Sequence, residues 1–324
     1  MDNNQNTVIE IAGKHLGKVG GEGYKSTYAP ELLVAVPRYY NRESYGIKEG
    51  DLPFVGGDVW NAYEVSAITE NGRPVNGMMK IYCPADSPAH VESKSIKLYL
   101  NSFNMTRLGS TAHECVNLVE QMVAKDLSKL LQTEVKVKFF TNEFTPEVEF
   151  GTDFIHLDQA VNLDEETFDT FHSDASQLQT TTAGPEEIKV TTKVTSNLLR
   201  SNCRVTNQPD WGDVYIEMET SGTNAPDFAS LAKYIVSHRE VSHFHEEICE
   251  MVFTHLTEAY QPSRLMVACL YTRRGGLDIN PIRATHTEMI PTMFTDVNYR
   301  NKKINKYSKN SNYREAKLVY EGNY

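Results

Sequence analysis

The chain has 324 residues, and this length suggests roughly two domains of about 150 residues each. Hydrophobic residues make up 40% and charged residues 23%, which is a globular composition and excludes a disordered or fibrous chain. The formal net charge of −11 argues against a protein that coats nucleic acid non-specifically. No apolar run approaches the ~20 residues of a membrane span, and the N-terminus shows no signal peptide.

The five cysteines are widely spread and include no CxxC pair. An odd number at such spacings argues against a disulfide framework and against a four-cysteine zinc site. We therefore expect reduced thiols and a cytoplasmic location.

In the first half, residues 58–84 predict a β-hairpin with turn chemistry at 70–74. Apolar residues at three- and four-residue steps predict a helix over 111–131. The alternation in EVKVKFF, residues 134–140, predicts a half-buried strand.

The second half repeats this order. Strands are predicted at 202–205 and 213–218, helices at 228–236 and 246–260, and a final strand at 265–271. Two short echoes support a duplicated module: YLNSF at 99–103 resembles YIVSH at 234–238, and HEC at 113–115 resembles HEEIC at 245–249.

Charge marks the segment between the halves and the C-terminal end. From Glu147 to Glu187 there are eleven Asp or Glu and no Lys or Arg, whereas Tyr299 to Tyr324 holds seven Lys or Arg and two Glu. We expect four regions: a first module over 1–146, an acidic, solvated linker over 147–188, a second module over 189–298 and a basic tail over 299–324.

Residues 91–99 form the first candidate site. Lys94 and Lys97 share one side of a helix turn, with hydroxyl groups between them. A helix start with serine and lysine can hold phosphate, and Glu92 could accept the N–H donors of a base. On residue types alone, an ordinary exposed helix start explains the same pattern.

A thiol and a carboxylate form the second candidate site. Cys203 precedes Asp210 by seven residues, across a tight turn that could bring both side chains to one point. Arg204 would favour a nucleophilic thiolate, and Asp210 could give a proton to the group that the sulfur attacks. The alternative is a buried structural cysteine beside a turn aspartate, and residue types alone favour this alternative.

The third candidate site lies at the start of the predicted helix 246–260. His245 and Glu246 could recognise a heterocycle through hydrogen bonds while Phe244 stacks on it, although acids also stabilise the first turn of any helix. His243, His245 and Cys249 have a spacing that zinc could use.

A phosphate-binding turn is the fourth candidate. Arg273, Arg274, Gly275 and Gly276 follow the predicted strand 265–271. Glycines allow close approach of the backbone to a ligand, and arginines bind oxyanions through two donors. Since the chain contains neither GxGxxG nor GxxxxGK[ST], a nucleotide here would not use a Rossmann or P-loop frame.

Together these stretches resemble one protein family. VESKSIKLYLNSFN, SNCRVTNQPDWG, FHEE and YTRRGGLDINP occur in the order typical of the NADPH-dependent 7-cyano-7-deazaguanine reductases, the QueF nitrile reductases, in their long two-module form. The resemblance extends to TYAPELLVAVPRYYNR and DLPFVGGDVWNAYEVS and covers roughly residues 14–283. The chain departs from the family in its longer linker and in its tail, and neither contains a motif position.

The resemblance implies a fold and an activity. The fold is α+β, with two tandem tunnelling-fold (T-fold) modules, each an antiparallel sheet with helices packed on one face. The activity is reduction of a nitrile to a primary amine with two NADPH through a covalent thioimide, in queuosine biosynthesis. The implied partners are a small-molecule substrate and a second copy of the chain in a homodimer, with no membrane, no required nucleic acid and no metal.

The resemblance also implies roles for individual residues. Cys203 matches the nucleophile and Asp210 the proton donor. The matching substrate-binding residues are Val91, Glu92, Ser93, His245 and Glu246. The matching cofactor-binding residues are Ser93, Lys94, Arg274 and Gly275. Because these motifs are divided between the halves, we expect one active site per chain, assembled between the modules.

Three other functions remain open at this stage. An amidine-forming relative would use the same thioimide but act on a base within nucleic acid, and the ESKSIK motif argues against it. A non-catalytic purine- or pterin-binding module would leave Cys203 without a role. A zinc enzyme of the cyclohydrolase type would need a bound metal.

Overall fold

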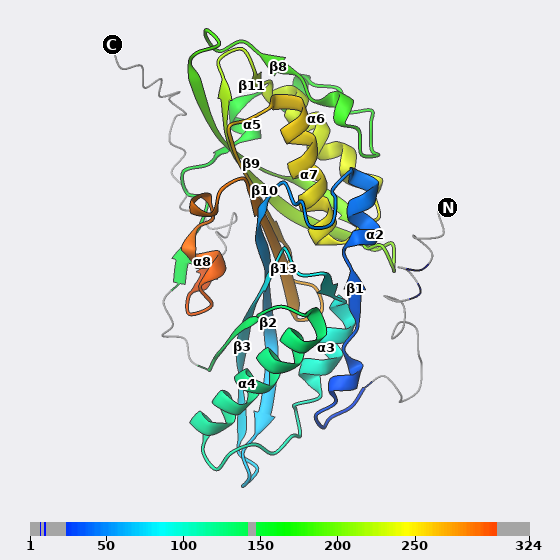
Figure 1. Cartoon of the computed structure of the whole chain (residues 1–324), viewed down its shortest axis with the longest axis vertical. Helices are drawn as coiled ribbons and strands as arrows, with labels where there is room; N and C mark the ends of the chain where they lie inside the picture. Colours follow the sequence, from blue (N-terminus) through cyan, green and yellow to red (C-terminus); the bar gives the residue numbers. More distant parts are fainter. Residues whose placement is uncertain (1–6, 8–9, 11–23, 142–146, 303–324) are drawn as a thin grey trace.

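The structure is a computed structural model that describes residues 7, 10, 24–141 and 147–302 (Figure 1). The predicted basic tail therefore lies outside the described residues from 303 onward. Among the described helices, none combines the length and the apolar character that crossing a bilayer requires.

A single sheet of eight strands runs through the described part of the molecule, in the order β5-β3-β2-β13-β12-β10-β9-β7. Its strands are β2 (Val55–Ile68), β3 (Pro74–Pro84), β5 (Lys136–Phe140), β7 (Ile155–His156), β9 (Lys189–Asn202), β10 (Pro209–Ser221), β12 (Arg264–Tyr271) and β13 (Leu277–Ala284). Neighbours are antiparallel except β7 and β9. β2 pairs with β13, so the two halves share one sheet.

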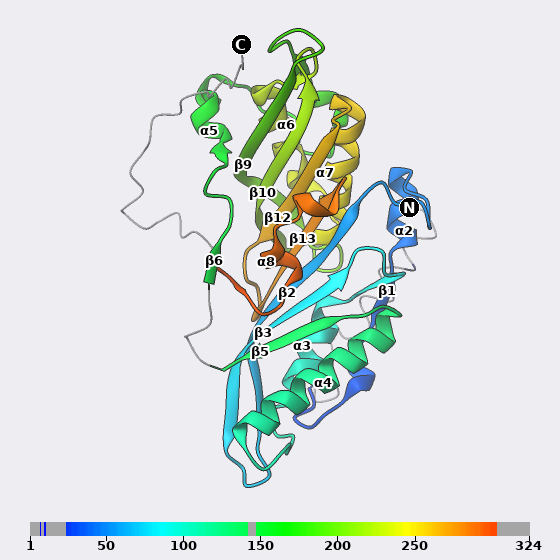
Figure 2. The ribbon, with the colours of Figure 1, turned by 60° about the vertical axis from the view of Figure 1, so that its left-hand side comes forward.

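Four helices cover one face of this sheet (Figure 2): α3 (Ser93–Asn101), α4 (Ala112–Leu131), α6 (Phe228–Ser237) and α7 (His245–Tyr260). The start of α4 is capped by Thr111, whose hydroxyl accepts a hydrogen bond from the backbone N–H of Glu114. Every fourth residue of α4 is buried, and this stripe packs on the strands of the first half; it consists of Cys115, Val119, Val123, Leu127 and Leu131.

The two halves repeat one order of elements, with two strands, then two helices, then a strand. The tyrosines of the sequence echo occupy matching places. The Tyr99 hydroxyl on α3 donates to Asp126 on α4 at 2.6 Å, and the Tyr234 hydroxyl on α6 lies 2.8 Å from Nδ1 of His255 on α7. This order is consistent with a duplicated module, and the T-fold assignment of each half stays a prediction.

Smaller elements complete the fold: β1 (Ala35–Pro37), α2 (Tyr39–Arg42), β4 (Ala89–Val91), β6 (Glu147–Glu149), α5 (Leu157–Ala160), β8 (Thr180–Thr181), β11 (Ala225–Pro226), α8 (Thr292–Thr295) and β14 (Arg300–Lys302). β1 pairs with β4, β8 with β11, and β6 with β14. α8 lies on the face of the sheet opposite the helices, where Phe294 packs against a core that includes Phe154 and Tyr215.

The acidic segment 147–188 is more than a solvated linker. Although most of its side chains are at least partly exposed, Phe154 and Leu157 are buried, and β7 joins the edge of the large sheet. Its few apolar residues anchor it to the second half by burial, while the acidic side chains that are described keep their contact with water.

Most predicted elements are confirmed, and two predictions in the second half are wrong. The hairpin 58–84, the strand 134–140, the strand 213–218, the helices 111–131, 228–236 and 246–260 and the strand 265–271 are present within a few residues. The strand predicted at 202–205 lies upstream, as β9, and residues 204–206 form a turn. The strand predicted as final is followed by another strand, β13. β13 was not predicted because it contains Pro281, and proline is rare in central strands.

Candidate active site

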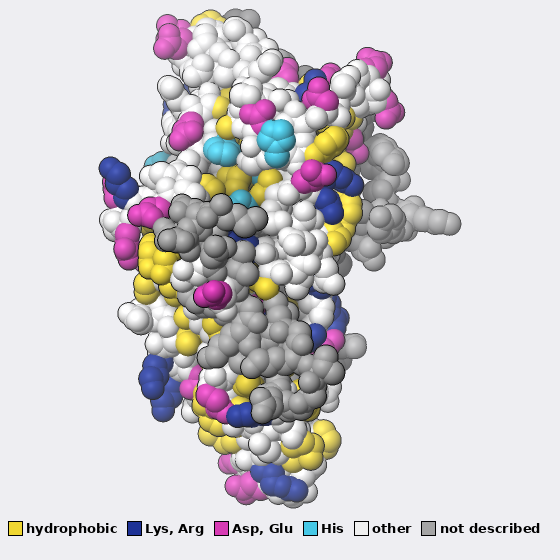
Figure 3. Space-filling view, turned by 90° about the vertical axis from the view of Figure 1, so that its right-hand side faces the viewer, with side chains coloured by type: hydrophobic (Ala, Val, Ile, Leu, Met, Phe, Trp, Pro, Cys, Tyr) yellow, Lys and Arg dark blue, Asp and Glu magenta, His cyan; other side chains and the backbone are white. Residues whose placement is uncertain are grey.

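A cavity of about 250 Å³ opens between the two halves. Its walls come from β4 and the start of α3 in the first half, and from the β9–β10 turn, the start of α7 and the β12–β13 turn in the second. Trp60 and Ile279, on the paired strands β2 and β13, belong to both the cavity wall and the core beneath α4. Figure 3 shows a face of the molecule on which histidine side chains gather beside hydrophobic ones.

Every site residue predicted from the sequence lines this cavity. They are Val91, Glu92, Ser93, Lys94, Cys203, Asp210, His245, Glu246, Arg274 and Gly275. The structure therefore brings these residues together in one cavity lined by both halves, while the active site itself and the role of each residue stay predictions.

Cys203 lies in the tight turn between β9 and β10. Its backbone N–H donates to the carbonyl of Gln208 at 2.8 Å, and its carbonyl accepts from the N–H of Asn207 at 2.9 Å. Asn207 closes the turn with φ of +54°, a conformation that asparagine tolerates better than most residues. Cys203 is half-buried, whereas the other four cysteines are buried, so it is the thiol that a ligand can reach.

Asp210 is held by groups from two other segments. Its Oδ1 lies 2.6 Å from Nη1 of Arg274, and its Oδ2 lies 3.4 Å from Nε2 of His245. The His245 ring stacks on Tyr271 with centroids 3.7 Å apart and planes 7° apart. Burial holds the pKa of Tyr271 well above its ordinary value, so this ring is a neutral support that orients the imidazole.

Glu92 is the N-cap residue of α3. Its carboxylate accepts hydrogen bonds from the backbone N–H groups of Lys94 at 2.9 Å and Ser95 at 2.6 Å. The side chain is buried, and this burial raises the pKa of Glu92 above its ordinary value, although the two N–H bonds act in the opposite direction. The helix start thus holds a carboxylate at the cavity wall.

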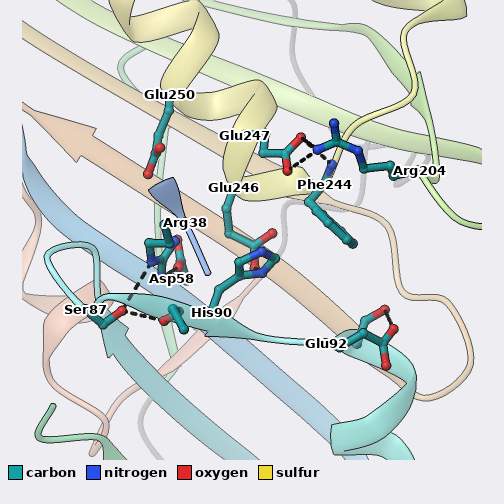
Figure 4. Close-up of polar contacts among 12 residues, drawn as sticks. Arg38, Asp58, Ser87, His90, Glu92, Arg204, Phe244, Glu246, Glu247 and Glu250 are labelled. Carbon is teal, nitrogen blue, oxygen red and sulfur yellow. Dashed lines mark hydrogen bonds and ion pairs between the residues drawn. The ribbon is translucent and has the colours of Figure 1, made fainter. Parts of the chain in front are cut away.

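Glu246 projects from the first turn of α7 toward β4 (Figure 4). Its Oε1 lies 3.6 Å from Nδ1 of His90, and both side chains are 4% exposed. The Phe244 ring meets the His90 ring nearly edge to face, with centroids 4.9 Å apart. The cavity therefore has a second buried carboxylate, on the opposite half of the chain from Glu92.

Cations gather where α3 meets the β12–β13 turn. Lys94, Lys97 and Arg274 line the cavity, and Gly275 has φ of +59°. A Cβ atom at Gly275 would lie 2.6 Å from Nζ of Lys97, so the missing side chain leaves room for this ammonium group. The side chains of these cations fit the phosphates of a nucleotide cofactor.

Two sequence interpretations are wrong. Arg204 does not serve the thiol; its guanidinium binds the Glu247 carboxylate at 2.8 and 2.9 Å. The three residues of the zinc reading point to separate partners: His243 to Glu247, His245 to Asp210, and Cys249 to the Val267 carbonyl. Among the described residues no cluster of metal-ligand type occurs. Sequence spacing misled because His243 pairs with Glu247 on the first turn of α7, whereas His245 and Cys249 bind groups on strands of the sheet.

Some cavity residues were not found from the sequence. His90 and Trp60 lie on strands, and Gln208 and Thr272 lie in the turns beside predicted residues. His90 could have been noticed as a neighbour of the VES motif, but its burial against α7 is a contact between the two halves that no local pattern reveals.

The cavity brings an accessible thiol, two buried carboxylates and a group of cations together in an α+β protein. Two family profiles match the chain: "Nitrile reductase, 7-cyano-7-deazaguanine-reductase N-term" over residues 24–139, and "QueF-like protein" over 209–289. Both matches include cavity residues.

Curated relatives match nearly the whole chain. The NADPH-dependent 7-cyano-7-deazaguanine reductase of Colwellia psychrerythraea is 38% identical over 293 residues, which cover 90% of this chain and 98% of the relative. That of Desulfotalea psychrophila is 42% identical over 277 residues, with coverage of 86% and 94%. The chain belongs to the NADPH-dependent 7-cyano-7-deazaguanine reductases, a family of oxidoreductases, which confirms the resemblance seen in the sequence.

A solved structure of the archaeosine synthase QueF-Like in the apo form is 18% identical and covers 31% of this chain and 94% of that chain, with a TM-score of 0.26. A match of this size carries no argument about fold or activity.

Proposed function

We infer that this protein reduces the nitrile of 7-cyano-7-deazaguanine to the aminomethyl group with NADPH, in the pathway to queuosine. The observation that carries this inference is the cavity itself. Within a chain of this family, the accessible thiol of Cys203 shares one cavity with Asp210, two buried carboxylates and a group of cations.

We propose that Cys203 forms a covalent thioimide with the substrate. Its sulfur adds to the nitrile carbon, and the thiol proton passes to the nitrile nitrogen through Asp210, so a C–S and an N–H bond form and no group leaves. NADPH, when bound, supplies the hydride for each of two reductions. The C–S bond breaks after the first, returning the electron pair to the sulfur. Two protons are taken up in all: one completes the amine and the other returns the thiolate to a thiol. Asp210 and His245, which lie 3.4 Å apart, are proposed to relay them.

The carboxylates are proposed to bind the base. A 7-deazaguanine ring presents several N–H donors, and a carboxylate offers only acceptors. Glu92 and Glu246 would accept these donors from opposite sides of the cavity, with Val91, Ser93 and His245 completing the contact. Because both carboxylates are buried, pairing them with donors removes a desolvation cost and favours this ring over one that lacks N–H groups.

The cations are proposed to bind the cofactor. Ser93 and Lys94 at the start of α3, and Arg274 and Gly275 in the β12–β13 turn, would hold the phosphates of NADPH. Arg274 also contacts Asp210, so the cofactor site adjoins the proton donor.

Intact mass of the protein mixed with the nitrile base, without NADPH, tests the thioimide. We expect the mass to rise by that of one whole base, because the addition has no leaving group. Cys203→Ala should abolish the adduct, and Cys115→Ala, which removes a buried thiol, should retain it. An adduct that persists in Cys203→Ala would contradict the mechanism.

Oxidation of NADPH on addition of the free base tests the reaction as a whole. An amidine-forming enzyme that acts on a base within nucleic acid would not oxidise NADPH under these conditions, so the assay separates the two functions.

The assembly, the modules and the location belong to the same proposal. We propose two tandem T-fold modules, bounded as predicted from the sequence, in a cytoplasmic homodimer that requires no nucleic acid. The outer edge of β5, at the end of the large sheet, supports the dimer because such an edge can pair with a second chain. The free thiols of the five cysteines support a reducing compartment. Light scattering of the purified protein would measure the oligomeric state.

A further inference from the structure

His90 lines the cavity, and none of the steps described above uses it. It is the central residue of β4, where it pairs with Val36 of β1, and it lies two residues before Glu92. Its side chain is buried, at 4% exposure. A buried imidazole loses its hydrogen bonds to water, so its two nitrogen atoms need partners within the protein or in a ligand.

The partner within reach is Glu246. Nδ1 of His90 lies 3.6 Å from Oε1 of Glu246, slightly beyond an ordinary hydrogen bond. Among the described residues, neither Oε1 of Glu246 nor Nε2 of His90 has a hydrogen-bond partner. The edge-to-face contact with Phe244 limits rotation of the His90 ring. His90 and Glu246 thus each have a polar atom without a hydrogen-bond partner among the described residues, and both residues line one cavity.

The position of Glu246 determines which ring nitrogen of His90 carries the proton. If Nδ1 carried a lone pair, it would face a carboxylate oxygen that is also an acceptor, and the two would repel. Nδ1 is therefore assigned an N–H group that faces Oε1, and a small movement would complete the hydrogen bond. Such a bond would select one rotamer of the Glu246 side chain, leaving its remaining acceptor positions for a ligand.

We propose that His90 is a positioning residue that acts on the substrate through Glu246. Its Nδ1–H group fixes the buried carboxylate in the orientation that accepts N–H donors of the deazaguanine ring. This proposal rests on the proposed function, because the ring supplies those donors. It concerns binding of the base alone and predicts no change in cofactor binding, since the cofactor residues lie on α3 and the β12–β13 turn.

Steady-state kinetics of the full-length protein test this role. We expect His90→Leu to raise KM for the base by roughly ten- to a hundred-fold, as loss of a hydrogen bond to a charged group does. KM for NADPH and kcat should stay within about two- to threefold, because the lost interaction acts equally in ground and transition states. Calorimetry with the base in a Cys203→Ala background should show the same loss of affinity without a covalent adduct.

Two polar variants separate positioning from packing. His90→Asn places an amide N–H near the position of Nδ1 and should restore binding of the base to within about threefold of the parent. His90→Gln places its amide nearer to Nε2 and should bind as weakly as His90→Leu. The comparison of Asn with Gln also decides the matter if the leucine variant does not fold.

His238→Leu is the matched control. His238 is a buried histidine at the end of α6, outside the cavity wall, and its Nε2 also has no partner among the described groups. This variant should lower stability without changing the ratio of the two KM values.

The proposal is overturned if His90→Leu binds the base like the parent, if KM for the base and for NADPH rise together, or if the asparagine variant is no better than the glutamine variant. Failure of the proposed function looks different, because the unaltered protein would then not oxidise NADPH with the nitrile base.

Discussion

Single buried charges set the chemistry of the cavity. The Glu92 carboxylate caps α3 and also lines the cavity, where it can contact a ligand. Its two backbone N–H bonds do not offset the loss of water, because burial is the larger effect on its pKa. In the free protein the charged carboxylate therefore carries a desolvation cost. Hydrogen bonds from N–H donors of a bound base would reduce this cost.

Glu92→Gln should weaken binding of the base and change how stability depends on pH. Because the folded protein raises the pKa of Glu92 above its ordinary value of 4.5, the folded state binds this proton more tightly than the unfolded chain. The free energy of unfolding of the parent should therefore fall, relative to Glu92→Gln, as pH rises from about 4 through the raised pKa. Urea unfolding of both proteins at several pH values measures the difference.

Glu114→Gln is the control with the opposite sign. Hydrogen bonds from Ser110 lower the pKa of Glu114, so its contribution to stability should be present at neutral pH and lost as pH falls through the ordinary glutamate range. Parallel stability curves for Glu92→Gln and the parent would contradict the assigned burial effect.

At the scale of elements, one buried lysine attaches the C-terminal segment to the sheet. Lys80 on β3 is fully buried, and its ammonium group donates to the backbone carbonyls of Met293, Asp296 and Tyr299 around α8. This contact lies on the face of the sheet opposite the helices, whereas the cavity shares the core beneath α4. The segment should therefore respond to Lys80 independently of the active site.

Lys80→Met should loosen residues 289–300 and leave kcat nearly unchanged. Removing the donor leaves the buried Met293 carbonyl unsatisfied, at a cost of about 1–3 kcal/mol, and the two partly buried carbonyls lose the same donor. Hydrogen exchange should increase in this segment and stay unchanged in α7. Lys136→Met, on an exposed position of β5, is the control and should alter neither. An equal increase in exchange throughout the sheet would contradict a local role.

At the scale of the whole molecule, a network of buried ion pairs connects the two halves where β2 pairs with β13. Arg283 on β13 is fully buried and binds Asp58 on β2 at 2.9 Å and Glu250 on α7 at 2.8 Å. Burial acts to raise the pKa of Asp58, yet the charges of Arg283 and Arg38 lower it to about 2. Arg42 binds Glu250 from the first half, so each acid has arginine partners from both halves.

Arg283→Met should destabilise both halves together. It leaves two buried carboxylates each with one partner fewer, and breaking such a pair costs about 3–5 kcal/mol. Because β2 and β13 belong to one sheet, calorimetry should show a single transition at lower temperature. Arg264→Met, which breaks the exposed pair with Glu288, should leave the transition temperature nearly unchanged, because water and salt screen an exposed ion pair. Two separate transitions in the parent protein would contradict a shared folding unit.

Local patterns predicted the elements that carry the site. The helix starts at Ser93 and near His245, and the turn between Cys203 and Asp210, follow from capping residues, periodicity and turn chemistry, which act over a few residues. The motifs in those places also identified the family. β9 was misplaced because its alternation is interrupted, and β13 was missed because of Pro281.

The ion-pair and hydrogen-bond partners of the charged side chains could not be predicted from local sequence patterns. Arg204 binds Glu247 rather than serving Cys203, and His90 meets Glu246 across more than 150 residues of chain. The sequence alone established which residue types stand at each turn and helix start, because those preferences are local. The pairing of β2 with β13, and with it the choice of charge partners inside the cavity, arose on folding, because burial and distance between remote segments determine which ions and hydrogen bonds can form.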